Sequence, residues 1–184
     1  WTGPDAAPNE IRDRVTRVIQ GHIAIATAVF PKGIGGAHLD ALARRALWQA
    51  GLDYDHGTGH GVGSYLSVHE GPVSISRLAR PVAIAPGMIL SNEPGFYLQD
   101  HYGIRLENLL LVRDADLPEA TKPFLCFETL TLAPFDRRLL NAALMTPEER
   151  QWLDAYHARV LRGVGPALGK AERDWLAAAC APIG

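Results

Sequence analysis

The sequence is poor in several features that would each point to a class of protein. It has only two cysteines, Cys126 and Cys180, and they lie too far apart for a cysteine-based metal site. Their scarcity favours reduced thiols and a cytoplasmic protein. No apolar run approaches the roughly 18 residues that span a bilayer, so we expect no membrane segment. The net charge of −2 leaves no basis for a nucleic-acid or membrane-surface binder.

The remaining composition is that of a soluble globular chain. Hydrophobic residues make up 47% of the 184 residues and charged residues 21%, which is enough for one sizeable core. The chain begins at Trp1 without an initiator Met or a signal-peptide pattern. We therefore expect it to be a piece of a longer protein.

The spacing of apolar residues predicts helices at both ends of the chain and strands between them. Helices are expected over 9–29, over 39–50 with Gly51 ending the helix, from Thr146 onward, and over 166–180. Thr146 is followed by Pro147 and Glu149, a capping box that starts a helix. Short apolar segments bounded by Gly, Pro and Asn predict strands over 60–69, 87–92, 104–112 and 127–132. This order indicates an α+β fold in which helices cover an antiparallel sheet.

The segment HGTGHGVGS, residues 56–64, is the most informative one. His56 and His60 are four residues apart and could share a helix face, but four glycines at roughly 1 kcal/mol each oppose a helix. In an extended chain the histidines share one face and the glycines the other, where another backbone can approach closely. His69 follows nearby. A single histidine is more often an ordinary polar residue than a ligand, but three in fourteen residues favour a functional site.

Charged residues occur at the end of one predicted strand and within another. Glu93 follows an apolar strand and precedes Pro94, which keeps it in extended backbone. Arg105 and Glu107 are two residues apart in the next strand, so we expect them on the same face. The non-functional interpretation is that Glu93 is simply a solvated strand end and that Arg105 and Glu107 lie on the solvent-facing side of a half-exposed strand. Together with His60 they offer imidazole and carboxylate groups on neighbouring strands, a set that Mn²⁺, Co²⁺ or Zn²⁺ accepts.

These motifs carry a family resemblance that covers nearly the whole chain. They are GTGHGVG at 57–63, VHEGP at 68–72, NEPG at 92–95 and GIRLEN at 103–108, with further likeness at 21–24, 46–54, 127–132 and in the C-terminal helices. They resemble the C-terminal half of the catalytic domain of an aminopeptidase P, an Xaa-Pro aminopeptidase of the pita-bread metallopeptidase family M24. The resemblance implies that residues 1–135 belong to this domain and that 136–184 form its helical extension.

The same resemblance implies roles for individual residues. His60, Glu93 and Glu107 would be ligands in a site for two divalent metals, most often Mn²⁺, with Glu93 also serving as an acid or base. His56 and His69 would hold the substrate and move protons, and Arg105 would orient a ligand carboxylate. The implied reaction is metal-assisted hydrolysis of the bond before a proline in the second position of a peptide. A cytoplasmic homodimer is also implied for the intact protein.

One element of the family pattern is missing from the sequence. The family has two further Asp ligands about eleven residues apart, and no two aspartates here have that spacing. The expectation is that they lie upstream of Trp1, so that this chain alone holds metal partly or not at all and has little activity. Three alternatives stay open: a non-catalytic pita-bread module that binds peptides or proteins, a prolidase or methionine aminopeptidase, and a dimerisation module.

Overall fold

The computed structural model describes residues 7–65 and 67–183, which form two compact units. One unit comprises residues 18–131, and the other comprises the N-terminal residues up to Arg17 together with those from Leu132 onward. The division falls within helix α1 (Asn9–Ala26). No helix in the described ranges combines the length and the apolar character needed to cross a membrane.

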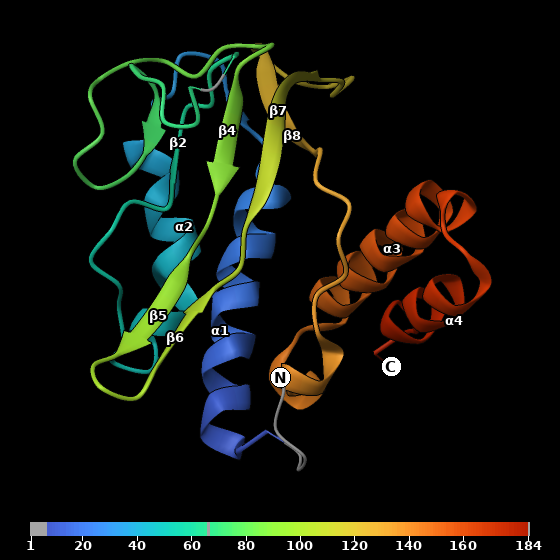
Figure 1. Cartoon of the computed structure of the whole chain (residues 1–184). Coiled ribbons are helices and arrows are strands. Elements are labelled where there is room, and N and C mark those ends of the chain that lie inside the picture. Colours follow the sequence, from blue (N-terminus) through green and yellow to red (C-terminus); the bar gives the residue numbers. More distant parts are fainter. Residues whose placement is uncertain (1–6, 66, 184) are drawn as a thin grey trace. The chain divides into compact units, whose positions relative to one another are not determined.

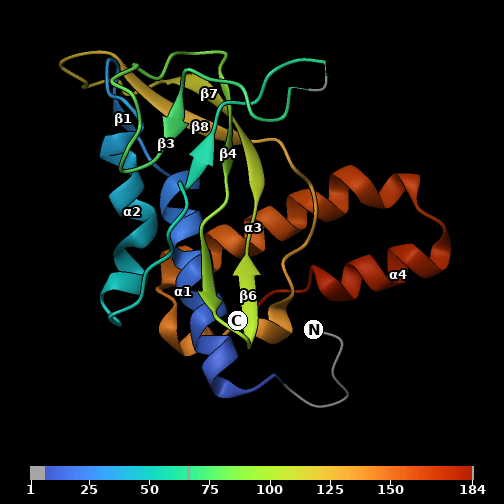
Figure 2. The ribbon, with the colours of Figure 1, turned by 60° about the vertical axis from the view of Figure 1, so that its left-hand side comes forward.

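Residues 18–131 build a sheet and the helices that cover it. A four-stranded antiparallel sheet has the order β1-β8-β7-β4, and two short hairpins pair β2 with β3 and β5 with β6. The strands are β1 (Phe30–Pro31), β2 (Gly59–His60), β3 (Ser74–Ile75), β4 (Ile89–Asn92), β5 (Gly95–Leu98), β6 (Tyr102–Arg105), β7 (Asn108–Ala115) and β8 (Phe124–Thr129). Helix α2 (Ala37–Trp48) runs beside α1 along the sheet (Figures 1 and 2). The structure confirms an antiparallel sheet covered by helices.

The core of this unit lies between the sheet and the two helices. Ile25 of α1 and Leu39 of α2 pack in one cluster with Leu90, Leu110 and Leu125 from three adjacent strands, all nearly inaccessible to solvent. The two helices approach closely because Gly21 of α1 has no side chain: a Cβ there would overlap the Ala43 carbonyl of α2. Glycine at position 21 thus allows α1 and α2 to pack directly against each other.

The other unit is helical. Its elements after Leu132 are three short 3₁₀ turns (Arg137–Leu139, Ala142–Leu144 and Gly165–Ala167), α3 (Pro147–Val164) and α4 (Lys170–Ala179). The capping box predicted at Thr146 is present, with the Thr146 hydroxyl and the Glu149 carboxylate each accepting from the other residue's backbone N–H. His157 of α3 is fully buried and accepts a hydrogen bond from the Phe135 backbone at 3.1 Å.

Several predictions of local structure need correction. The segment 60–69 is not a continuous strand: after Gly59 and His60 it makes one isolated bridge, between Gly61 and Leu90, and then continues as turns and loop. The strand predicted over 104–112 is two strands, β6 and β7, separated at Leu106 and Glu107. Helix α1 ends at Ala26, three residues before the end predicted for it. In α2 the buried face includes the charged residues Asp40 and Arg44, whereas the apolar Leu42 is exposed.

Candidate metal centre and active site

Glu93 and Glu107 occupy opposite positions in the two strands of a bent hairpin. The ladder between β4 and β7 ends at the pair Asn92 and Asn108. One step further along, Glu93 stands opposite Glu107, and β5 and β6 then resume pairing in the same register. Residues opposite each other in an antiparallel pair have Cα atoms about 5 Å apart. The backbones of Glu93 and Glu107, which are 14 residues apart in the sequence, are therefore neighbours in the hairpin.

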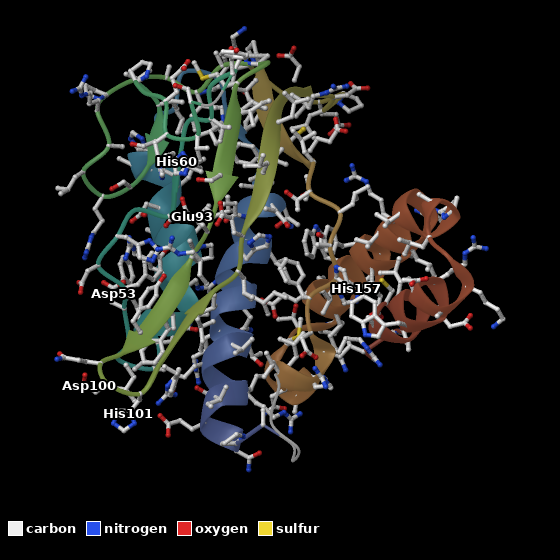
Figure 3. All side chains as sticks on the ribbon, in the orientation of Figure 1. Asp53, His60, Glu93, Asp100, His101 and His157 are labelled. Atoms are coloured by element: carbon white, nitrogen blue, oxygen red, sulfur yellow. The ribbon has the colours of Figure 1, made fainter. Side chains whose placement is uncertain are left out.

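The Glu93 carboxylate is held from several directions. The residue is only 8% exposed, so its charge requires partners. Its Oε1 accepts a hydrogen bond of 2.9 Å from the Ser91 hydroxyl and lies 3.2 Å from His60 Nε2. Its Oε2 lies 3.3 Å from an Arg105 guanidinium nitrogen. Figure 3 labels His60 and Glu93 beside the end of β4.

The contact between His60 and Glu93 calls for a cation or a proton. His60 Nδ1 lies 2.8 Å from the Gly61 carbonyl oxygen, which only accepts, so Nδ1 carries the hydrogen. In neutral His60 the lone pair is then on Nε2, directed at a carboxylate oxygen. Two lone pairs face each other at 3.2 Å. An imidazole with its second nitrogen bonded to a backbone carbonyl is the usual orientation of a metal-binding histidine, so this donor pair fits a divalent cation.

The backbone around His60 is hydrogen-bonded to β4 and to Glu93, the residue that follows it. The His60 N–H donates to the Ser91 hydroxyl at 2.9 Å, and the Glu93 N–H donates to the Thr58 carbonyl at 2.7 Å. A Cβ on Gly59 would overlap the Ser91 carbonyl. This confirms the prediction that glycine here allows the close approach of another backbone. Strand pairing within 56–64 is limited to Gly59 and His60 and to the isolated bridge of Gly61 with Leu90.

His56 is connected to Glu93 through two side chains. Its Nδ1 donates to the Gly57 carbonyl, which leaves Nε2 to accept from the Tyr97 hydroxyl at 2.9 Å. The Tyr97 oxygen in turn accepts from Arg105 Nε at 2.9 Å. Burial lowers the pKa of Arg105, but the Tyr97 hydrogen bond and the charges of Glu93 and Glu107 outweigh it and raise the pKa above its ordinary value. The guanidinium therefore stays charged beside both carboxylates.

A buried arginine holds the segment that carries His56. The Arg44 guanidinium donates to both Asp40 oxygens, to Asp53 Oδ1, and to the backbone carbonyls of Tyr54 and His56, at 2.6 to 3.2 Å. It also stacks on the Tyr54 ring, 3.9 Å from the ring centre. Since the Arg44 side chain is only 1% exposed, these contacts tie the loop after α2 firmly to the helix.

The hydroxyl groups of this loop continue the same network. Thr58 donates to Asp40 at 2.7 Å and lies 2.5 Å from the Tyr54 hydroxyl. Burial raises the pKa of Tyr54 to about 12, against the Thr58 hydrogen bond and the Arg44 charge, which lower it. Burial raises the pKa of Asp53, but the hydrogen bond from Arg44 and others bring it below its ordinary value. The phenol stays protonated and the carboxylate charged near neutral pH.

The structure brings most of the predicted site residues together. The rings of His60 and His69 lie 4.2 Å apart, and Glu107 is exposed at the break after β6, where its charge acts on Arg105. Within residues 7–65 and 67–183, however, no three His, Cys, Asp or Glu side chains are grouped so that they could hold a metal ion. The assignment of metal ligands thus stays a prediction.

Sequence reasoning missed Tyr97 and the Arg44 network. Tyr97 could have been found by extending the period-two pattern from Glu93 through Gly95, since Tyr97 falls on the same face. Asp40 and Arg44 are four apart on α2, a spacing typical of an ion pair. Nothing in the sequence indicates that this pair is buried.

Comparison with known proteins identifies the family. Residues 1–114 match metallopeptidase family M24, and residues 123–183 match the C-terminal region of the same peptidase family. The chain belongs to metallopeptidase family M24. This confirms the resemblance drawn from the sequence motifs.

The similar curated proteins are much longer than this chain. It is 47% identical over 189 aligned residues to a probable Xaa-Pro aminopeptidase P of Coprinopsis cinerea, and 46% identical over 189 to the Xaa-Pro aminopeptidase app-1 of Caenorhabditis elegans. Both alignments cover 100% of this chain and 30% of the relative. The M24 chain thus spans less than a third of the length of the relatives it matches.

Solved structures agree with the sequence comparison. The X-prolyl aminopeptidase of C. elegans, described as a cytosolic enzyme with a di-nuclear active site, superposes with a TM-score of 0.92 at 45% identity, covering 99% of this chain and 30% of that one. A prolidase from Pyrococcus furiosus gives 0.52 at 28% identity, covering 66% of this chain and 33% of that one. The fold of the M24 chain is that of the matching region of the C. elegans enzyme.

Proposed function

We propose that this chain is the C-terminal part of a metal-dependent Xaa-Pro aminopeptidase, which hydrolyses the bond between an N-terminal residue and a following proline. In this proposal residues 1–135 contribute to the pita-bread catalytic domain and 136–184 form its helical extension. The observation that carries the proposal is the approach of His60 Nε2 to Glu93 Oε1 at 3.2 Å, in an M24 chain 47% identical to a probable Xaa-Pro aminopeptidase P.

His60, Glu93 and Glu107 are the proposed metal ligands. When bound, two Mn²⁺ ions would supply the Lewis acid that lowers the pKa of water and polarises the peptide carbonyl. Two carboxylates carry a charge of −2 against +4 for two such ions. This chain by itself is therefore expected to take up metal partly or not at all and to have little activity, and full occupancy requires further carboxylates from the longer protein.

The other site residues act on the substrate or on the ligands. His56 and His69 are proposed to hold the scissile carbonyl or the proline and to move protons to the leaving nitrogen. Arg105, 3.3 Å from Glu93 Oε2, orients that carboxylate. Tyr97 links Arg105 to His56 by hydrogen bonds of 2.9 Å, so the orientation of His56 depends on the same guanidinium.

The cellular setting is part of the proposal. We place the intact protein in the cytoplasm, as the C. elegans enzyme is described as cytosolic, and expect it to form a homodimer. Trp175 on α4 is 65% exposed, and a large aromatic residue of this kind is frequent in the core of protein interfaces.

The test uses the longer protein that contains this chain. With added Mn²⁺ it should release the first residue of an Xaa-Pro-Xaa tripeptide. The variant His60→Ala should lose bound metal together with rate, whereas His69→Ala should keep its metal while kcat falls about 10²-fold or more, as for loss of an acid–base group.

Any different result of these assays would contradict part of the proposal. Absence of turnover in the metal-loaded protein would favour a peptide- or protein-binding module. Hydrolysis limited to Xaa-Pro dipeptides would indicate a prolidase, and release of N-terminal Met a methionine aminopeptidase. Full metal stoichiometry in His60→Ala would remove His60 from the ligand set.

A further inference from the structure

His22 of α1 is a fully buried histidine that contacts Asn92 and Asn108, where the pairing of β4 with β7 ends. Its Nε2 lies 3.2 Å from the Asn108 side-chain amide, and its backbone carbonyl accepts a 2.9 Å hydrogen bond from the Asn92 side chain. Burial lowers the pKa of His22 to about 4, although backbone hydrogen bonds to Leu106 and Asn92 raise it. The imidazole is therefore neutral in the folded protein.

The residues bonded to His22 flank the two candidate metal ligands. Asn92 directly precedes Glu93, and Leu106 and Asn108 stand on either side of Glu107. Asn92 and Asn108 also form the last pair of the ladder between β4 and β7. His22 is thus tied to both strands next to the two glutamates, through its ring to Asn108 of β7 and through its backbone carbonyl to Asn92 of β4.

The ladder of backbone hydrogen bonds is interrupted at Glu93 and Glu107, so it does not fix their positions by itself. Pairing stops after Asn92 and resumes at Gly95, and Pro94 between them has no N–H to donate. The Leu106 N–H reaches the Pro94 carbonyl at 3.2 Å, a bond at the outer end of the normal range. The spacing of Glu93 and Glu107 therefore depends on anchors outside the hairpin.

We propose that His22 is a positioning residue that keeps Glu93 and Glu107 opposite each other at the spacing required to bind divalent cations. The proposal rests on the function proposed above, in that it takes these glutamates as ligands. The Asn108 side-chain amide lies within hydrogen-bond distance of His22 Nε2, at 3.2 Å. A side chain of similar length with a hydrogen-bonding end should therefore replace His22, and an apolar one of that length should not.

The experiment measures Mn²⁺ binding by equilibrium dialysis on the longer protein after metal depletion. The variant His22→Met fills the space without a hydrogen bond, and His22→Gln keeps a polar group near the position of Nε2. We expect the Kd for Mn²⁺ to rise about 10-fold or more in His22→Met, as for other residues that orient ligands, and to stay within about threefold in His22→Gln. His157→Gln, which changes the other fully buried histidine, is the control and should not alter the Kd.

A second variant keeps the proposal testable if His22→Met fails to fold. Asn108→Leu removes the amide group that lies 3.2 Å from His22 Nε2 and should weaken Mn²⁺ binding in the same direction. A folded His22→Met protein with a lower melting temperature but an unchanged Kd would show a purely structural role and overturn the proposal. If the unaltered protein binds Mn²⁺ without cleaving Xaa-Pro peptides, the proposed function fails, while the comparison of Kd values still decides the role of His22.

Discussion

Replacing Arg44 by Met should unfold the chain at much lower urea concentration. Arg44 and Asp40 have side chains only 1% and 2% exposed, so the variant leaves the Asp40 carboxylate buried, with the Thr58 hydroxyl as a remaining partner. Removing one partner of a buried ion pair costs about 3–5 kcal/mol. With a urea m-value of about 2 kcal/mol/M, the midpoint of unfolding should fall by roughly 2 M.

Two further variants show whether burial is the cause. Arg113 pairs with Glu128 at the surface, with side chains 59% and 42% exposed, so Arg113→Met should cost less than about 1 kcal/mol. The double variant Arg44→Met/Asp40→Leu should recover part of the loss, because no charge is then left buried. Urea unfolding followed by circular dichroism measures all three. A midpoint for Arg44→Met no lower than that of Arg113→Met would refute the reasoning.

Two shorter predictions concern pH and helix capping. Because the pKa of His22 is about 4 in the fold and about 6.5 when unfolded, only the unfolded chain gains this proton as the pH falls between those values. Relative to His22→Gln, the unaltered chain should thus lose about 3 kcal/mol of stability from pH 7 to pH 4, as measured by unfolding at each pH. Thr146→Ala removes the side-chain cap that accepts from the Glu149 N–H of α3 and should cost about 1 kcal/mol in urea unfolding.

The helices were the most predictable part of the fold because their signals are local. The box of Thr146, Pro147 and Glu149 fixes the start of α3 by contacts within one turn. The end of α1 was harder to predict, since Val29 continues the apolar spacing but lies outside the helix and is half exposed. An apolar residue near a helix end does not by itself decide whether the chain continues as helix.

Strand limits depended on partners that lie far away in the sequence. The apolar run over 104–112 reads as one strand, yet it bends at Leu106 and Glu107 because its partner strand bends at Glu93 and Pro94. Conversely, the glycine-rich segment after His60 looks extended in sequence but makes only an isolated bridge, between Gly61 and Leu90. Alternation in one segment says nothing about whether a second segment is present to complete the ladder.

The composition of the site was predictable, and its connections were not. The sequence supplied His60 and Glu93 as candidate ligands and correctly placed glycine where β4 approaches. It gave no indication that Tyr97 would join Arg105 to His56. That link requires the register of β5 with β6, which is set by the turn between them and by neither strand alone.

The register of the bent hairpin explains why two glutamates, a tyrosine and an arginine share one side of the site. With Glu93 opposite Glu107, a period of two puts Tyr97 and Arg105 on the same face of the hairpin, with Arg105 diagonal to both Glu93 and Tyr97. The observed contacts of Arg105 with these two residues follow this diagonal. A slip of one residue between β5 and β6 would turn Tyr97 to the opposite face relative to Arg105, so the electrostatics of the site depend on the pairing of the hairpin as much as on the identity of its side chains.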